Sequence, residues 1–244
     1  MKKIIFVSLI LLLTFSTNAQ EQEEVKQPKN EIGIDLIDLV DATLQISYER
    51  MLGKHISVNL GLGYKTEEGL INLSGIDRDQ IKTGGLTYSG FKVVPEVRYY
   101  LNAKEDYKMN GFYFGAYLKY SNLSSDLDGI YIDTNDNDRE YILEFDADLN
   151  VTSVGFMIGY KLPVWKNLSL DFLIAGPGAG FYNFSIKNSR DDTPPEFYED
   201  LNEALENYSF FDFLNSDFKF SDINNKTSFG IPSFRYGISL GYSF

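Results

Sequence analysis

The sequence predicts an all-β protein, an eight-stranded antiparallel transmembrane β-barrel with short periplasmic turns and long extracellular loops. Three observations lead to this prediction. Segments of alternating apolar and polar residues recur along the chain, the connections between them alternate between short and long, and the last segment ends on the aromatic Phe244. Successive side chains of a strand point to opposite faces, so a period of two indicates strands with one apolar face.

The first 19 residues have the three parts of a secretory signal peptide. Lys2 and Lys3 precede an apolar run over residues 4–15, and a small-residue site ends at Ala19. The run is shorter than the ~20 apolar residues that a membrane-spanning helix needs. The chain has no cysteine, hence neither a disulfide nor a thiol for lipid attachment. We expect cleavage after Ala19, a flexible periplasmic lead-in over residues 20–30 and one barrel domain over residues 31–244.

Eight strands are predicted after the lead-in, and most have the ~9–11 residues that a tilted membrane-spanning strand requires. Their ranges are 31–38, 43–51, 55–65, 87–101, 112–122, 151–162, 168–186 and 233–244. Pro95 lies inside the fourth strand. Because proline cannot donate a ladder hydrogen bond, we expect a β-bulge there.

The connections support a barrel because their lengths alternate. Short turns are predicted at residues 52–54, 103–110 and 165–167, and long loops at 66–86, 123–150 and 187–232, while the connection at 39–42 is short for an outer loop. Outer-membrane barrels keep short turns in the periplasm, so an even number of strands places both termini there. A soluble β-sandwich, the alternative fold, does not explain this alternation.

Several motifs resemble those of the small outer-membrane β-barrel proteins of Bacteroidota. They are Asn18-Ala19-Gln20, Ile46-Ser-Tyr-Glu-Arg-Met-Leu-Gly53, Pro95-Glu-Val-Arg-Tyr-Tyr-Leu101, Gly176-Pro-Gly-Ala-Gly180 and the aromatic C-terminal strand. More distantly, the chain is similar to OmpA- and OmpX-type barrels. The resemblance implies a place in the outer-membrane lipid of a Gram-negative bacterium. It also implies that the barrel assembly machinery recognises the strand ending at Phe244.

The inward-facing positions of the predicted strands carry charges of both signs. They are Asp35, Glu49, Lys92, Glu96, Arg98, Lys119, Lys161, Asp171 and Arg235. Charges in a narrow lumen must pair or be hydrated, because an isolated buried ion is costly. An eight-stranded barrel is only just wide enough for its own side chains. We therefore predict a plug of salt bridges, which permits at most a gated or very small conductance.

Two loops carry the negative charge of the mature chain. Residues 126–148 contain nine acidic residues and one arginine, and residues 188–230 contain ten acidic and three basic residues. The acidic outer face excludes nucleic acid as a partner, but it can attract divalent cations. An extracellular protein or a polysaccharide is the other partner class that we expect at these loops.

One stretch of the first acidic loop has the spacing of a calcium-binding loop. Asp133, Asn135, Asn137 and Glu144 fall at positions one, three, five and twelve, which supply oxygen ligands for Ca²⁺. Asp138 stands where the motif has glycine. A hydrated acidic loop is the alternative interpretation, so calcium is the one cofactor that the sequence suggests.

The second acidic loop predicts one short amphipathic helix. Its apolar stripe consists of Phe197, Leu201, Ala204, Leu205 and Tyr208. The stripe either packs on the barrel mouth as a lid or forms a docking surface together with Phe210, Phe211, Phe213, Phe218 and Phe220. The sequence leaves both interpretations open.

No catalytic constellation is evident, and we expect no enzymatic activity. The single histidine, His55, belongs to a predicted periplasmic turn, and zinc chemistry lacks ligands in a chain without cysteine. The predicted function is a structural or surface-interaction role of a monomeric barrel through its acidic loops. A narrow channel and an outer-membrane lipid-modifying enzyme are the alternatives.

Overall fold

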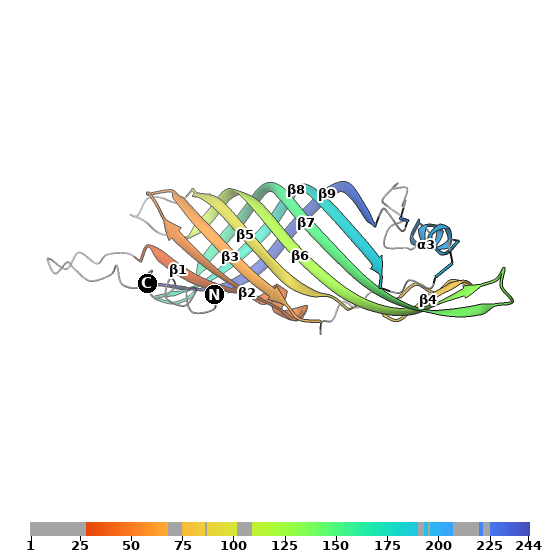
Figure 1. Cartoon of the computed structure of the whole chain (residues 1–244). Helices are drawn as coiled ribbons and strands as arrows, with labels where there is room; N and C mark the ends of the chain where they lie inside the picture. The colour runs from red at the N-terminus through yellow and green to blue at the C-terminus, as the bar shows by residue number, and fades with distance from the viewer. Residues whose placement is uncertain are drawn as a thin grey trace, which may run out of the picture.

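The computed structural model describes residues 28–67, 75–85, 87–101, 109–189, 193–194, 196–206, 220–221 and 225–244. Within them, nine strands form one antiparallel sheet, accompanied by two helices (Figure 1). The strands are β1 Asn30–Asp35, β2 Thr43–Met51, β3 Ile56–Lys65, β4 Ile81–Thr83, β5 Ser89–Tyr100, β6 Gly111–Asp133, β7 Arg139–Pro163, β8 Leu168–Asn188 and β9 Lys226–Ser243; the helices are α2 Leu36–Val40 and α3 Phe197–Glu206. The predicted signal peptide lies outside the described residues.

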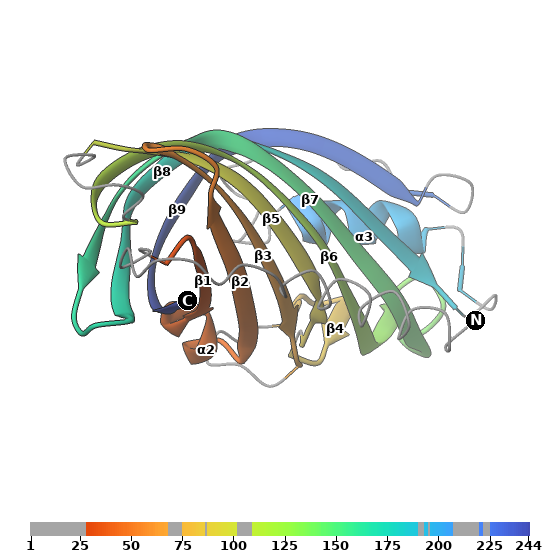
Figure 2. The same ribbon diagram turned by 90° about the vertical axis from the view of Figure 1, so that its left-hand side faces the viewer.

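The sheet closes on itself because its first and last strands pair. β1 is hydrogen-bonded to both β2 and β9, and β6 to both β5 and β7, so the ring runs β1, β2, β3, β5, β6, β7, β8, β9 and back to β1. Figure 2 shows β9 curving round to lie beside β1. The short strand β4 pairs with β6 beyond the ring. The predicted count of eight strands therefore missed one strand, which lies within the predicted loop 66–86.

The first predicted strand, 31–38, is too long because Asp35 begins a helix instead. The Asp35 carboxylate accepts hydrogen bonds from the backbone N–H groups of Ile37 and Asp38, both at 3.0 Å, and thereby caps α2. An aspartate in this N-cap position satisfies donors that a new helix leaves free. The second predicted strand, 43–51, is confirmed without change as β2.

The largest difference from the sequence prediction is the loop 123–150, which is a strand pair. β6 and β7 run to 23 and 25 residues, and their register stays unbroken from the Gly111–Lys161 pair to the Asp133–Arg139 pair. The turn between them has Asn137 and Asp138 at positive φ, a conformation that these residue types tolerate. We refer to residues 123–133 of β6, residues 139–150 of β7 and strand β4 together as the extension. At ~3.3 Å per residue its 11 residues on β6 span ~36 Å along the strand, and its base is still paired with β8 as far as the Phe145–Asn188 pair.

The predicted bulge at Pro95 is wrong. The β5–β6 register is the same before and after this residue, although Val94 and Pro95 have no partners on β6. The proline thus removes a ladder bond without inserting a residue. The register shifts instead between Leu173 and Gly176 on β8, where the glycine-rich segment 176–180 begins.

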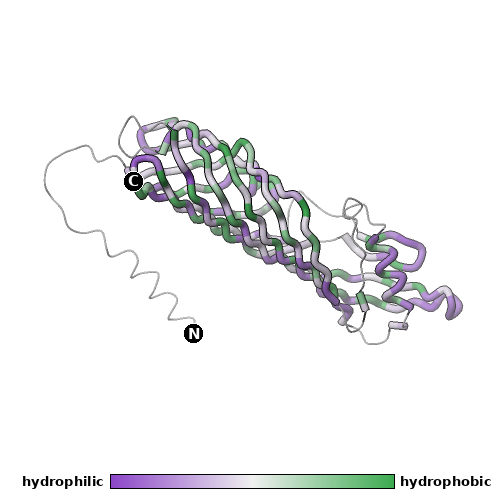
Figure 3. Tube along the Cα trace, turned by 90° about the horizontal axis from the view of Figure 1, so that it is seen from above, coloured by the Kyte–Doolittle hydropathy of each residue, from purple (hydrophilic) through white to green (hydrophobic). Residues whose placement is uncertain are grey.

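The ring is apolar outside and polar inside. On β3, Ile56, Val58, Leu60, Leu62 and Tyr64 are exposed, whereas Ser57 and Asn59 are buried. Figure 3 shows apolar positions along the whole barrel wall and hydrophilic ones concentrated at the far end, on the extension and α3. Within the described residues, no helix is long and apolar enough to cross a membrane.

Both described ends of the chain meet at the end of the ring opposite the extension. The backbone N–H of Phe244 donates to the Asn30 carbonyl at 2.8 Å, and the N–H of Asn30 donates to the Phe244 carbonyl at 3.3 Å. The short turns at residues 52–55 and 164–167 lie at this same end.

Candidate functional site

A network of buried charges crosses the lumen, and Lys161 is its most buried cation. Its Nζ lies 2.7 Å from Glu31 Oε1 and 2.6 Å from Glu49 Oε2. It also lies 3.9 Å from Asp171 Oδ2. With 1% of its surface exposed, Lys161 on β7 contacts β1 and β2, which are not its neighbours in the sheet, as well as the adjacent strand β8.

Arg98 forms the second centre of the network. Its Nη1 lies 2.9 Å from Glu49 Oε2 and 2.6 Å from Asp171 Oδ2. Its Nη2 lies 2.6 Å from Glu96 Oε2. One guanidinium thus binds three carboxylates from strands β2, β5 and β8, which uses the fixed fork of donors that arginine presents.

Two tyrosines close the lumen around these ions. Tyr100 donates to Glu49 Oε1 and Tyr113 donates to Asp171 Oδ1, each at 2.8 Å. Both side chains are fully buried, and their ring centroids are 5.4 Å apart. Because these bulky rings and the ions that they contact occupy one layer, the lumen is filled there.

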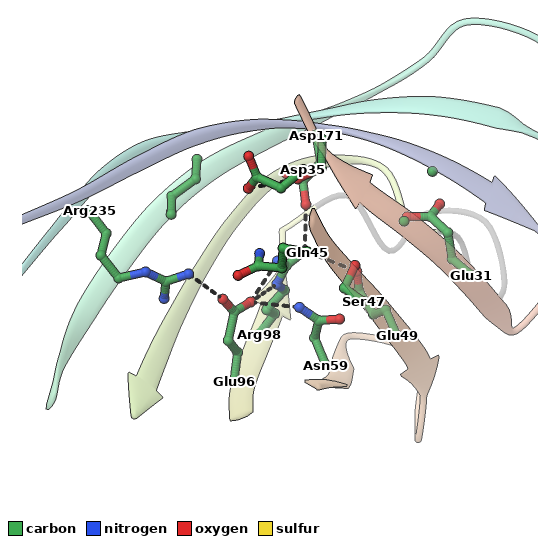
Figure 4. Close-up of a pocket in the computed structure, with 14 residues that line it drawn as sticks. Glu31, Asp35, Gln45, Ser47, Glu49, Asn59, Glu96, Arg98, Asp171 and Arg235 are labelled. Atoms are coloured by element: carbon green, nitrogen blue, oxygen red, sulfur yellow. Dashed lines mark hydrogen bonds and ion pairs between the residues drawn. The ribbon is translucent and has the colours of Figure 1, made fainter. Parts of the chain in front are cut away.

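The network continues towards the extension through Glu96 (Figure 4). Glu96 accepts hydrogen bonds from Asn59 Nδ2 and from Arg235 Nη2, both at 3.0 Å. The Arg235 guanidinium lies over the Tyr117 ring, 4.5 Å from its centroid. A cavity of about 30 Å³ remains between these groups and Glu49, which is the space of roughly one water molecule.

Of the nine predicted lumen charges, the structure brings six together: Glu49, Glu96, Arg98, Lys161, Asp171 and Arg235. The other three lie nearer the extension. Asp35 caps α2, and Lys92 forms an ion pair with Asp38. Lys119 forms no ion pair within the described residues.

Sequence reasoning missed Glu31, Tyr100 and Tyr113. Glu31 has the same parity as Gly33 and Asp35, so the alternation of the first strand places it inward. The tyrosines have inward parity too, but a tyrosine is equally common on an apolar wall. Their hydroxyl contacts distinguish them, and these contacts depend on the closed ring.

The predicted amphipathic helix is present as α3, and its apolar stripe is covered. Phe197, Leu201, Ala204 and Leu205 are buried against side chains of the extension such as Leu143. The stripe therefore packs on the extension rather than across the barrel mouth, which corrects the location of the predicted lid. Phe220 belongs to the same cluster, whereas Tyr208, Phe210, Phe211, Phe213 and Phe218 lie outside the described residues.

Polar contacts fix α3 on the extension as well. Tyr131 donates to Asp200 Oδ2 at 2.6 Å, and its ring packs edge-on against Phe197. Burial of the phenol raises the pKa of Tyr131, and the hydrogen bond to the Asp200 carboxylate raises it further. Asn202 exchanges two hydrogen bonds with the backbone of Phe220, at 2.9 and 3.0 Å.

The four predicted calcium ligands are spread along the tip of the extension. Asp133 ends β6 and accepts a hydrogen bond from the Asn135 N–H, and Asn137 lies in the turn. Glu144 pairs with Asp128, five residues along β6 from Asp133, which is ~16 Å away in a strand. Among the described residues, no three acidic or histidine side chains are grouped to hold a metal ion.

The outward face of the extension opposes like charges across the strands. Asp126 lies opposite Asp146, and Asp128 lies opposite Glu144. These four side chains are exposed, and like charges directly opposite each other in an antiparallel pair destabilise it. The acidic segment is thus a strand face, not the hydrated loop that the sequence predicts.

His55 lies in the turn before β3. Its Nδ1 is 2.8 Å from the Tyr100 carbonyl oxygen, and its ring stacks on Tyr99 with centroids 5.1 Å apart. These are the contacts of a structural turn residue.

Comparison with known proteins gives a family without an assigned activity. A family model described as "Protein of unknown function (DUF3575)" matches residues 5–210. A search of the curated proteins finds no match. The chain is similar to a solved structure of a major outer membrane protein from Thermus thermophilus, with 15% identity, a TM-score of 0.38 and coverage of 89% of this chain and 98% of that chain.

Proposed function

We propose a function from the geometry of this chain, because the chain belongs to the DUF3575 family of proteins of unknown function. It is an outer-membrane β-barrel that does not conduct and that carries an acidic extension outside the cell as an interaction surface. The termini and short turns face the periplasm. The expected partner is an extracellular protein or polysaccharide.

This proposal rests on the change from apolar to polar side chains along the outer face of β6 and β7. Phe112, Phe114 and Leu118 are exposed and apolar, whereas Ser124 and Asp126 on the same face are exposed and polar. The other ring strands expose apolar residues at the same level, which makes a continuous band. A band of this kind exceeds the apolar patches of soluble monomers and is the surface that lipid covers.

The filled lumen supports an anchoring role over a channel. Arg98, Lys161 and the two buried tyrosines occupy the layer through which an ion would pass. Opening a path would separate ion pairs inside a low-dielectric wall, which is costly for each unpaired charge.

The extension supports a surface role because it packs with α3 and with Ile186 of β8 rather than with the residues of the lumen. Its cluster of buried residues is separate from the cluster in the lumen. Its outer face keeps like charges in opposition although neutral residues would pair better. A binding partner with complementary charge removes that repulsion.

Cysteine labelling tests the topology, since the natural chain has no cysteine. Asp128→Cys places one thiol on the extension, and Lys166→Cys places one in a turn at the opposite end, so each variant is the control for the other. A membrane-impermeant maleimide should label Asp128→Cys on intact cells, and Lys166→Cys only after the outer membrane is permeabilised. Equal labelling of both on intact cells, or the reverse order, contradicts the proposal.

The surface role has its own test. Joining residue 124 to its cross-strand partner, residue 148, by a two-residue turn removes the outer part of the hairpin. The shortened barrel should still insert and show the altered electrophoretic mobility of a folded barrel, but cells should lose adhesion to immobilised extracellular protein or to polysaccharide. Unchanged adhesion to both would contradict the proposed role of the extension.

A further inference from the structure

The part of the lumen nearer the extension contains a cation without a counter-ion. Lys119 lies on β6 and is half-buried. The charges that act on it are those of Lys92, Arg235 and Asp38, so two of its three charged neighbours repel it. Within the described residues, no carboxylate or carbonyl accepts a hydrogen bond from its Nζ.

The neighbouring cations already have their own partners. Lys92 is paired with Asp38, and Lys65 lies 3.2 Å from Asp41 Oδ2. Among the described lumen cations on this side, Lys119 is therefore the one whose charge has no ion pair. A half-buried lysine without a counter-ion is poorly stabilised unless a diffusible anion supplies the negative charge.

Arg235 supplies a second free donor at the same site. Its Nη2 is bound to Glu96 Oε1 at 3.0 Å, and its guanidinium is held against the Tyr117 ring. Its Nη1 is buried and has no hydrogen-bond partner. The ion pair and the ring contact fix the plane of the guanidinium, so this N–H donor has a defined direction.

Two serine hydroxyls adjoin the lysine. Ser153 lies directly opposite Lys119 on β7, and Ser121 is the next inward residue on β6. Both are buried in the wall of the lumen. Lysine, arginine and serine together form a donor set with the chemistry that binds oxyanions.

Size and access limit the ligand. The interior of an eight-stranded ring has little room beyond its own side chains, and the tyrosine layer closes the side towards the termini. A ligand therefore enters and leaves on the side of the extension and is not passed through. The single unpaired charge of Lys119 matches a monovalent oxyanion such as dihydrogen phosphate or a carboxylate.

We propose that the lumen binds a small oxyanion between Lys119 and Arg235, with hydroxyl donors from Ser121 and Ser153. The proposed site lies in the part of the lumen nearer the extension, on the far side of the tyrosine layer from the termini. It is separate from the acidic surface proposed above, so either assignment can fail without the other.

Titration calorimetry with the mature chain in an uncharged detergent tests this site, with inorganic phosphate and acetate as probes in a phosphate-free buffer. The natural chain should bind phosphate saturably at one site, with acetate competing for it. Lys119→Met should weaken binding at least about tenfold, because it removes the charge-assisted donor. Lys166→Met, which removes the same charge from an exposed turn, should leave binding unchanged.

Arg235→Lys is the second variant, because it retains the charge but loses the fixed Nη1 donor. It should bind phosphate several-fold more weakly than the natural chain while its far-ultraviolet circular dichroism stays unchanged. The proposal is overturned by an absence of saturable heat from the natural chain or by equal binding in Lys119→Met. Displacement of phosphate by an equal concentration of chloride would also overturn it, because a spherical ion does not need the donor set.

Discussion

Arg98 Nη1 lies 2.6 Å from Asp171 Oδ2, and this contact joins β5 to β8 across the lumen of a closed ring. The two residues are 73 positions apart in the sequence. Neither strand is a neighbour of the other in the sheet. The contact therefore braces the barrel from within, independently of the backbone ladder.

Replacing Arg98 with methionine should destabilise the barrel by about 3–5 kcal/mol, because it leaves buried carboxylates without their cation. Urea unfolding of the refolded protein in detergent measures this change. Arg139→Gln is the matched control, since Arg139 is exposed and its ion pair with Asp136 spans 3.5 Å. An exposed pair contributes only about 0–1 kcal/mol. Equal effects of the two variants would show that the network contributes nothing to stability.

Leu201→Ala should loosen α3 without opening the ring. Leu201 is 1% exposed within the cluster of the extension, and truncating a buried leucine costs about 2–5 kcal/mol. Hydrogen exchange should accelerate in α3 and in residues 139–145, while β2 and β3 keep their protection. Glu206→Ala, on the exposed face of the same helix, should change neither. Faster exchange throughout the ring would mean that the extension is not a separate unit.

The Tyr131–Asp200 contact should make the docking of α3 dependent on pH. Since the pKa of Tyr131 is raised in the folded protein, the folded state holds the phenolic proton more tightly than the unfolded chain does. The stabilisation is therefore complete below the ordinary pKa of about 10 and is lost as pH rises through the folded-state value.

Tyr131→Phe removes this dependence and should itself cost about 1.5–3 kcal/mol, the range for hydrogen bonds to charged groups. Exchange of α3 amides, measured against pH from 8 upward, gives both quantities. Tyr141→Phe is the control, because Tyr141 is half-buried beside the same cluster. A pH profile of Tyr131→Phe that coincides with that of the natural chain would contradict the assignment.

Asp128→Lys should stabilise the extension, because it converts a like-charge pair with Glu144 into an attractive one. Cross-strand pairs of this kind differ by roughly 0.2–1 kcal/mol. Slower amide exchange at Leu127 and Leu143 at low salt would report the gain. The double variant Asp128→Lys, Glu144→Lys restores the repulsion and should lose that gain, and 1 M salt should reduce the difference.

Alternation in the sequence predicts the ring because each of its strands has an apolar outer face. The clearest case is β3, where five exposed apolar residues alternate with small or polar ones. The extension does not follow this pattern of apolar outward residues. Its outward residues, such as Asp126 and Asp128, are charged and its inward residues pack against α3, so the segment has the composition of a loop. Only contact with a helix distant in sequence shows that the alternation continues there.

The lumen network is likewise predictable from the sequence only in part. Parity identifies which residues face inward, so Glu49, Arg98 and Lys161 could be placed in the lumen from sequence. Which of them meet depends on the relative stagger of strands around the closed ring. Lys119 and Arg98 look alike in the sequence, yet Arg98 contacts three carboxylates and Lys119 contacts none in the described structure.

The pairing of Asn30 with Phe244 has a consequence for how the chain folds. These residues are 214 positions apart in the sequence, so the seam between β1 and β9 has the longest sequence separation in the described sheet. Contacts of such separation incur the largest loop-closure entropy and form late. The ring can therefore close only when both β1 and β9 are present, and the unclosed sheet presents two free edges until then. A circularly permuted chain, with its ends moved to the turn at residues 164–167 and the old ends linked, should turn this last step into an early, local hairpin.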